Sequence, residues 1–413
     1  MRSIEEYVGV DDALDYILSE VRPSAVSDLI MSQDGFGRVS AADVTAESDF
    51  PPYDVSHMDG FAVRSSDLSN ASRSHPARLR IIAEVSLGDV VGGRVRSGEA
   101  VRVATGSPIP QGADTVVQTE MAKTIGTSLV VDTRQESGTH VYRRGRDVRR
   151  GERVMAKGRV IRAQDVGLLL GLGIARVSVF KKPRVSIIAT GNELTDVSRP
   201  ADGKTVESHS HVFSALLRTI GCEPLGYGNV RDDPVALSKK LKEALVESDL
   251  VMTLGGTSVG AHDLVGSVVS DLHPEVLFHG IRMDRGRVSG VALVDGRPLV
   301  LLPGPIQGAM NAFLLLVAPI VQRLSGRIEN GMEVGCKLAN DWRARKKFSH
   351  FTKVVYVSLK SGSETLASVV EGDTESATVL TNADGYIVVR ENVTKLKKAS
   401  RVRVRLLPGF SPA

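Results

Sequence analysis

TLGGTSVGAHD, residues 253–263, follows an apolar run, Leu250–Met252, that is typical of the end of a buried strand. A helical pattern, Asp263–Leu272, comes directly after it. A glycine loop between strand and helix exposes backbone N–H groups and a helix N-terminus, which attract an anion, and a carboxylate at its end can hold a cation. A glycine-rich turn capped by Ser258 or Asp263 explains the same residues, so the loop alone leaves both interpretations open.

The chain around this loop alternates strand and helix patterns. The strand patterns are VSIIAT (185–190), PLGYGNV (224–230), DLVMTL (249–254) and LVLLPG (299–304). Helical patterns follow at 211–221, after Asp232–Asp233–Pro234, and at 309–324. This alternation predicts a parallel, doubly wound sheet with helices on both faces. Ligands of such sheets bind outside the carboxyl ends of the strands, where Gly191 and Gly304 would lie.

The flanking segments have a different texture. Residues 4–21 have helical spacing, and short β-like runs separated by glycine and proline fill about 38–180. Short strand patterns return after Ser325–Gly326. We therefore expect a multidomain α/β protein with three parts: a β-rich N-terminal region with a helix (1–180), a doubly wound α/β domain (181–326) and a small C-terminal β domain (327–413).

The composition restricts the class of protein. Hydrophobic residues make up 42% and charged residues 24% of the 413 residues, which fits soluble globular domains. The 52 basic and 48 acidic residues are intermixed, so the net charge of +4 does not argue for nucleic acid and suits a small anionic substrate equally well. Cys222 and Cys336 offer no disulfide framework, which favours the cytoplasm. An acidic N-terminus and a longest apolar stretch of Phe313–Val321 predict neither a signal peptide nor a membrane span.

Carboxylates accompany the glycines at three strand exits. Glu193 follows Gly191, Asp232 opens a helix and Asp263 ends the glycine loop. Clustered carboxylates with open positions suit Mg²⁺, which keeps waters and bridges substrate phosphates. Helix capping explains Asp232 and Asp263 as well, so both interpretations stay open.

Two arginine-rich segments are candidates for anion binding. IRMDRGRV (281–288) carries Arg285 and Arg287 around a glycine, and arginines of this kind form forked contacts with phosphate or oxyanion oxygens. RRGRDVRRGER (143–153) is denser and contains Asp147. A charged surface loop and a solvated hairpin are the respective alternatives.

Six segments resemble, in order, signatures of the MoeA family of molybdopterin molybdenumtransferases, a family that includes the E domain of gephyrin. They are PPYDVSHMDGFAV (51–63), VRVATGSPIPQGADTVVQTE (101–120), RRGRDVRRGE (143–152), IIATGNEL (187–194), GNVRDDP (228–234) and GGTSVGAHD (255–263). The resemblance covers nearly the whole chain. It implies two interleaved β-rich N-terminal domains, a MogA-like molybdopterin-binding domain and a β-barrel-like C-terminal domain.

The resemblance also implies an activity. Family members insert molybdate or tungstate into adenylylated molybdopterin and release AMP with Mg²⁺, as homodimers in which the MogA-like domain of one protomer faces the N-terminal domains of the other. It implies catalytic roles for Asp59, Asp147, Glu193, Asp263 and Arg287. It implies cofactor binding by Thr105, Gly255, Gly256, Ser258, Gly260, Arg285, Pro303 and Gly304. It implies Mg²⁺ ligands at Asp232, Asp263 and Glu193.

The chain departs from the family pattern on one side of the expected pocket. Asp284 stands where the family has a lysine, Glu207–Ser210 replaces an Asp/Asn motif, and Pro305 replaces an asparagine. Opposite charges ~4 Å apart interact by about 4 kcal/mol at an effective dielectric constant near 20. The sign reversal therefore weakens anion binding unless Arg282 or Arg285 compensates. These changes predict a divergent transferase; the competing hypotheses are a non-catalytic or altered-specificity molybdopterin-binding paralogue and a MogA-type adenylyltransferase.

Overall fold

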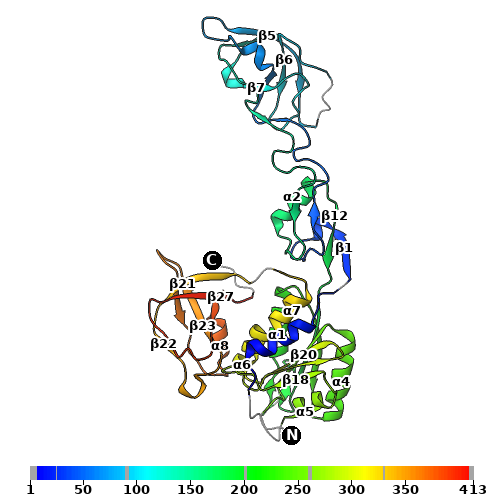
Figure 1. The fold of residues 1–413 in the computed structure, drawn as a ribbon, viewed down its shortest axis with the longest axis vertical. Helices are drawn as coiled ribbons and strands as arrows, with labels where there is room; N and C mark the ends of the chain where they lie inside the picture. Colours follow the sequence, from blue (N-terminus) through cyan, green and yellow to red (C-terminus); the bar gives the residue numbers. More distant parts are fainter. Residues whose placement is uncertain are drawn as a thin grey trace.

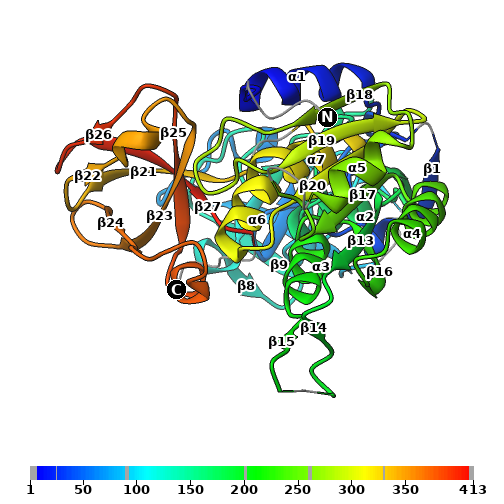
Figure 2. The ribbon, with the colours of Figure 1, turned by 90° about the horizontal axis from the view of Figure 1, so that it is seen from below.

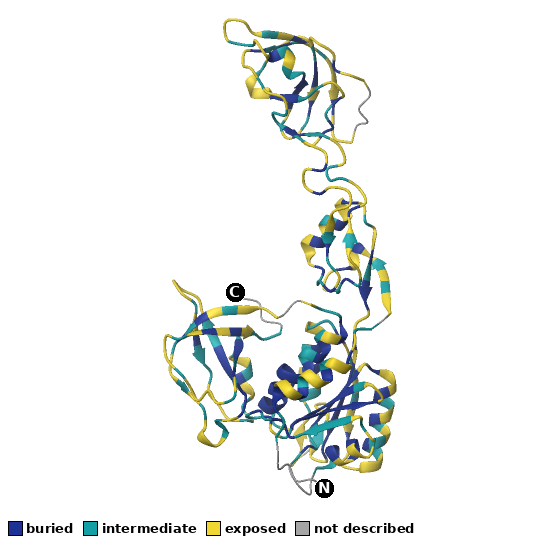
Figure 3. Ribbon diagram, in the orientation of Figure 1, coloured by how far each residue is buried: buried dark blue, intermediate teal, exposed yellow. Residues whose placement is uncertain are grey.

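The chain is described as a computed structural model covering residues 7–24, 26–88, 93–199, 202–258, 263–328 and 331–408. It is elongated, with a β-rich N-terminal domain at one end, a small middle region, and an α/β domain at the other end (Figure 1). The C-terminal domain lies beside the α/β domain. Buried residues gather separately inside each part, so each has its own core (Figure 3).

The α/β domain is built on a six-stranded sheet of order β16-β13-β17-β20-β19-β18. Its strands are β13 (Arg184–Thr190), β16 (Glu223–Val230), β17 (Leu250–Leu254), β18 (Val276–His279), β19 (Gly290–Val294) and β20 (Arg297–Leu302). The first four strands in the order are parallel, as predicted. The expectation of a wholly parallel sheet is wrong at one edge, where β19 runs antiparallel to both of its neighbours, β20 and β18. Asp295 and Gly296, both at positive φ, form a two-residue turn that obliges β19 and β20 to be a hairpin.

Helices cover both faces of this sheet (Figure 2). They are α3 (His209–Thr219), α4 (Pro234–Glu247), α5 (Leu264–Ser270), α6 (Ile306–Ala312) and α7 (Ala318–Leu324), with the π-helical turn η4 (Phe313–Val317) joining α6 to α7. Helices α4 and α5 pack on one face. Helices α3, α6 and α7 pack on the other. This arrangement confirms the doubly wound architecture.

The N-terminal helix α1 (Val10–Glu20) packs on the α/β domain rather than with the N-terminal β strands. Its residues Val10, Ala13 and Ile17 are buried in the same core as Val185 of β13. In the sequence analysis this helix is assigned to the N-terminal region 1–180 only because it precedes the β strands of that region in the chain. Its apolar stripe is instead buried against the α/β sheet, which shows that proximity in sequence does not decide which core a helix joins.

One helix, Ile306–Leu324, is long and apolar enough to cross a membrane by length and composition. However, 78% of its apolar window is buried inside the protein. Its Phe313 ring packs against Phe213 of α3 with ring centroids 5.3 Å apart. It is therefore the central core helix of the α/β domain.

The N-terminal β domain is inserted into the middle region. Its six-stranded sheet consists of β4 (Gly60–Val63), β5 (Ala77–Val85), β6 (Glu99–Val103), β7 (Thr115–Gln118), β8 (Lys123–Ile125) and β9 (Ser128–Val131). The middle region contains β1 (Ser27–Met31), β2 (Val44–Thr45), β11 (Arg153–Met155), α2 (Ala163–Gly171) and β12 (Arg176–Phe180). The chain crosses between them twice, where β3 (Val55–Ser56) pairs with β10 (Val141–Tyr142).

The C-terminal strands close into a barrel of order β21-β24-β23-β25-β27. Its strands are β21 (Glu333–Leu338), β23 (Lys353–Lys360), β24 (Leu366–Val369), β25 (Gly385–Val389) and β27 (Arg401–Leu406); β22 (Trp342–Arg343) pairs with β26 (Lys395–Leu396), and α8 (Ala377–Thr381) is a short helix. The barrel has its own apolar core.

Both cysteines are buried, and this predicts their chemistry. Burial raises the pKa of the Cys222 thiol to about 12 and also raises the pKa of Cys336. The thiolate is the reactive form, so neither cysteine should react with a chromogenic disulfide reagent at pH 8 in the folded protein. Both should react once the chain is denatured. Rapid labelling of the native protein would contradict this prediction.

Candidate active site

The carboxyl ends of the four parallel strands meet at one edge of the sheet. Thr190 at the end of β13 pairs with Val230 of β16, and Leu254 at the end of β17 pairs with Leu302 of β20. The predicted exit at Gly191 therefore lies beside the glycine loop. This edge is where open α/β sheets bind ligands.

The glycine loop is packed tightly against the neighbouring exit. Gly255 and Gly256 both have positive φ, 82° and 64°. A Cβ at Gly256 would lie 2.5 Å from Thr190 Oγ1 and 2.7 Å from a methyl group of Val265. Only glycine fits this turn. Ser258 is half-buried, and the predicted cofactor-binding residue Gly260 lies outside the described residues.

Asp263 closes the loop and begins α5. One carboxylate oxygen accepts a hydrogen bond of 3.0 Å from the Gly266 backbone N–H, and the other lies 3.0 Å from His279 Nδ1. The capping interpretation is therefore realised at Asp263. Both of its oxygens have partners within the protein.

Glu193 and Asp232 lie on adjacent exits. The Asn192 backbone N–H donates to Asp232 at 3.1 Å, and the Asn192 side chain accepts from the Asp232 N–H at 3.3 Å. The Glu193 carboxylate turns back over Gly191, 2.6 Å from where a Cβ would stand. Asp233, not Asp232, caps α4 with its side chain. Asp232 is thus left exposed at the edge of the sheet.

The three predicted Mg²⁺ ligands, Glu193, Asp232 and Asp263, do not form a preformed metal site. No group of three His, Cys, Asp or Glu side chains among the described residues is arranged to hold a metal ion. Asp263 is already engaged by Gly266 and His279. Glu193 and Asp232 remain, and two exposed carboxylates fit Mg²⁺ in its common mode, held by one or two carboxylates, waters and substrate phosphates.

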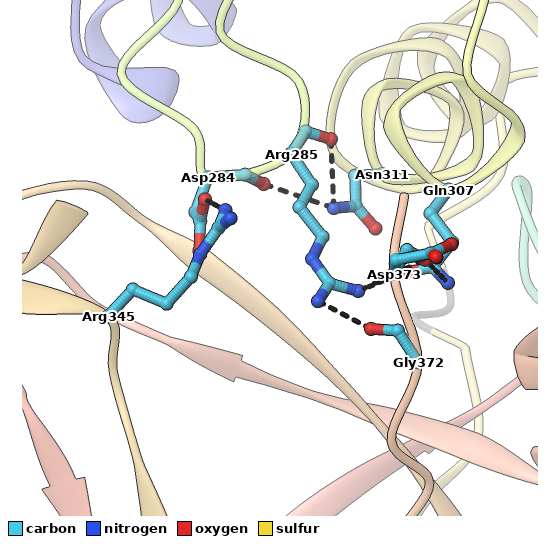
Figure 4. A network of polar contacts seen from close by, with 7 residues as sticks. All are labelled: Asp284, Arg285, Gln307, Asn311, Arg345, Gly372 and Asp373. Carbon is cyan, nitrogen blue, oxygen red and sulfur yellow. Dashed lines mark hydrogen bonds and ion pairs between the residues drawn. The ribbon is translucent and has the colours of Figure 1, made fainter. Parts of the chain in front are cut away.

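The wall opposite the loop is fixed to the C-terminal domain (Figure 4). Asp284 forms an ion pair with Arg345 of that domain. The cation that pairs with Asp284 is thus Arg345, which the sequence analysis did not consider. Arg282 pairs with Glu391 at 3.2 Å. The reversed charge is neutralised by a residue 61 positions away in the sequence.

Arg285 points along the domain junction. Its guanidinium donates to the Gly372 carbonyl at 2.6 Å and to the side chain of Gln307. Burial, together with the nearby positive charge of Arg345, lowers the pKa of Arg285. Asn311 donates to the Arg285 carbonyl at 3.2 Å. Arg285, predicted to bind the cofactor, thus joins the α/β domain to the C-terminal domain.

Arg287 is the exposed cation of this wall. Its guanidinium lies 5.6 Å from the ring centroid of Phe348, and Arg345 and Lys347 lie 4.7 and 5.9 Å from the same ring. The next residue, Val288, accepts a 2.7 Å hydrogen bond from the Thr257 hydroxyl of the glycine loop. A concentration of positive charge therefore adjoins the loop, which suits an anionic ligand.

After β20, Pro303 is buried and Gly304 is exposed. Pro305 occupies the N-cap position of α6. The proline that replaces the family's asparagine therefore stands at the start of α6. The backbone of Gly304, just before it, stays exposed at the strand exit.

Asp59 and Thr105 form a second cluster, in the N-terminal β domain. Asp59 accepts hydrogen bonds from the backbone N–H and hydroxyl of Thr105 at 2.6 and 2.8 Å, which hold the pKa of its carboxyl below the usual value. Asp147 is exposed, and its backbone N–H donates to the Phe50 carbonyl. Arg143 pairs with Asp54 at 2.7 Å. The hairpin interpretation of residues 143–153 is wrong, because β10 pairs with β3 and β11 pairs with β2.

These clusters are far apart in one chain. Asp59 and Thr105 belong to the N-terminal β domain at one end of the molecule, and Glu193 and Asp232 belong to the α/β domain at the other (Figure 1). The structure therefore brings the predicted residues together in two groups, not one.

Sequence reasoning missed several residues of the site. Gln307 and Asn311 are almost fully buried on an otherwise apolar helix, four positions apart, and that pattern was an available signal. Thr257 belongs to the predicted glycine loop, but the sequence did not indicate a role for its hydroxyl. Arg345 and His279 had no local signal, because each finds its partners through tertiary contacts.

Family profiles match the N-terminal region and the α/β domain of the chain. A family profile described as MoeA N-terminal region (domain I and II) matches residues 8–173, and one described as a probable molybdopterin binding domain matches residues 186–323. Molybdopterin molybdenumtransferase of Staphylococcus aureus (strain COL) is 31% identical over 363 residues, covering 87% of this chain and 86% of the relative. The enzyme of that name from Bacillus subtilis (strain 168) is 31% identical over 381 residues, covering 91% and 88%.

The fold is similar to a solved structure throughout. The molybdopterin biosynthesis MoeA protein from Pyrococcus horikosii superposes with a TM-score of 0.85 at 28% identity, covering 98% of this chain and 100% of that one. The resemblance seen in the sequence signatures thus extends to all four parts of the molecule.

Proposed function

Because this chain belongs to the MoeA family of molybdopterin molybdenumtransferases, transferases of molybdenum cofactor biosynthesis, we propose that it inserts molybdate or tungstate into adenylylated molybdopterin and releases AMP. The observation that carries the proposal is the glycine loop. It is closed against Thr190 on one side and joined to Val288 on the other, beside the exposed Arg287. Backbone N–H groups and a guanidinium on facing sides suit a substrate with two phosphates.

The division of roles follows from the contacts. We assign Gly255, Gly256 and Ser258 to the phosphates and Arg287 to the oxyanion. Asp263 contributes by holding the loop, since both of its carboxylate oxygens are engaged within the protein. Arg285, Pro303 and Gly304 complete the wall on the side of the C-terminal domain.

Magnesium belongs to the proposal. Glu193 and Asp232 would hold the ion, because both carboxylates are exposed at neighbouring strand exits. When bound, Mg²⁺ neutralises charge on the phosphates as AMP leaves. Asp263 is not a ligand of the ion in this proposal, because Gly266 and His279 occupy its carboxylate oxygens.

A homodimer completes the site. The N-terminal β domain, which carries Asp59 and Thr105, lies at the opposite end of the chain from the α/β domain, which carries Glu193 and Asp232 (Figure 1). The two pairs therefore cannot act in the same pocket of one chain. A two-fold related partner can present its N-terminal domains to this α/β domain, and each dimer then has two shared sites. We place this reaction in the cytoplasm, consistent with two buried, unpaired cysteines.

The proposal predicts AMP release that depends on molybdate. Incubating the full chain with adenylylated molybdopterin, Mg²⁺ and molybdate should release AMP in proportion to the metal inserted, and chelating Mg²⁺ should suppress release. Substituting tungstate for molybdate tests the choice of oxyanion. Tight binding of molybdopterin in calorimetry with no AMP release would support the non-catalytic paralogue instead. ATP consumption with metal-free molybdopterin would support the adenylyltransferase hypothesis.

A further inference from the structure

One imidazole ring contacts residues on both sides of the glycine loop. His279, the last residue of β18, lies with Nδ1 3.0 Å from the Asp263 carboxylate and with Nε2 3.0 Å from the Thr257 hydroxyl. Thr257 and Asp263 flank the five loop residues 258–262 in the sequence. The side chain of His279 is 15% exposed and that of Asp263 is 19% exposed, so these contacts are largely shielded from water.

The hydrogen-bond inventory fixes which groups donate. The Thr257 hydroxyl has one hydrogen and donates it to the Val288 carbonyl at 2.7 Å. It is therefore an acceptor toward His279, so Nε2 donates. The Asp263 carboxylate only accepts, so Nδ1 donates as well. A histidine ring donates from both nitrogens only as the imidazolium, so these two contacts require the doubly protonated ring; an asparagine or glutamine amide has a single NH₂ group and cannot donate in two opposite directions.

Two glycines leave room for the ring. A Cβ at Gly266 of α5 would lie 2.7 Å from His279 Nδ1 and 2.3 Å from the Asp263 carboxylate. A Cβ at Gly290, which is paired with His279 across the sheet, would lie 3.3 Å from His279 Cδ2. Glycine within a helix or strand costs roughly 0.5–1 kcal/mol relative to alanine. The space is thus kept for the ring at two positions where glycine is unfavourable.

We propose that His279 is a positioning residue for the transferase reaction, which holds Thr257, between the phosphate-binding residues Gly256 and Ser258, at a fixed distance from Asp263. It acts through Thr257 and Asp263 and does not contact the substrate. Through Val288 the same chain of hydrogen bonds sets the distance between the loop and Arg287. This inference rests on the proposed function, since it names the residue that shapes the phosphate site of that reaction.

The test uses His279→Phe in the full chain. Phenylalanine fills the same space between the glycines and donates to neither partner. The loop binds the phosphates before and during the reaction alike, so the loss should appear mainly in KM. We expect KM for adenylylated molybdopterin to rise on the order of 10-fold or more, with a much smaller change in kcat. The Kd of the same compound, measured by calorimetry, should weaken in parallel.

Further variants separate positioning from general damage. Gly266→Ala should reproduce the rise in KM, because its methyl group displaces the His279–Asp263 pair. Thr257→Val should also raise KM, since it removes both the contact with His279 and the hydrogen bond to the Val288 carbonyl. His75→Phe, at an exposed histidine of the N-terminal domain, is the matched control and should behave like the wild type.

The outcomes distinguish this inference from the proposed function. Wild-type KM and Kd in His279→Phe, with normal AMP release by the wild type, overturn the role of His279 and leave the proposed function standing. If the wild type releases no AMP, the proposed function fails, and the Kd comparison alone decides whether His279 shapes the loop. A lower melting temperature with unchanged KM and Kd would reduce His279 to a purely structural residue.

Discussion

Mixing two inactive variants should restore AMP release to about a quarter of the wild-type level if the site is shared between protomers of a dimer. Asp59→Asn disables the N-terminal half of the site and Asp232→Asn disables the α/β half. Each alone should lower the rate on the order of 100-fold, as expected when one positioned charge is removed. Both substitutions keep an oxygen that accepts the hydrogen bonds now made by Thr105 and Asn192, so the local fold should survive.

The expected fraction follows from the symmetry. Random pairing makes half of the dimers mixed, and in each mixed dimer both defects fall in one site while the other site is intact. Asp232→Asn mixed with Glu193→Gln is the matched control. Those defects lie in the same half, so every site of a mixed dimer carries one and no activity should return. Co-expression from differently tagged chains verifies that mixed dimers form, and no recovery in them would refute the shared site.

The positions where the parallel strands end could be predicted from the sequence, because the residues that mark them are adjacent in the chain. Apolar runs ending at glycine mark where parallel strands stop, and parallel strands stop at one edge. The antiparallel edge was missed although the Asp295–Gly296 hairpin signal was present. Capping was ambiguous for a different reason. Asp232 and Asp233 are adjacent, and only the coordinates show that Asp233 caps α4 while Asp232 bonds to Asn192.

Long-range contacts account for the rest of the misses. The Asp284–Arg345 pair joins residues 61 positions apart, with no pattern in either segment that predicts the other. A charge reversal that looked unfavourable in the sequence is therefore neutral in the structure. His279 illustrates the same limit, since its partners come from another strand exit and from a helix cap. Such pairs follow from how the domains and loops pack.

The second large effect is expected from Gly256→Ala, which tests the loop itself. The residue has φ of 64°, where a side chain costs roughly 1–2 kcal/mol. Its Cβ would also lie 2.5 Å from the hydroxyl of Thr190, a buried residue with no space to retreat. The loop must therefore shift by a substantial part of an ångström, and a displacement of ~1 Å at such a site can cost on the order of 100-fold in rate.

Gly221→Ala separates backbone strain from displacement of the loop. Gly221 also has positive φ, 90°, but a Cβ there meets no atom within 4 Å. Both variants should lower the melting temperature by a few degrees, at ~2–4 °C per kcal/mol for a domain of this size. Only Gly256→Ala should lower the rate of AMP release on the order of 100-fold and weaken binding of adenylylated molybdopterin. Equal activity in the two variants would mean that the glycines serve the turn alone, and the capped-turn interpretation of residues 253–263 would then replace the phosphate site.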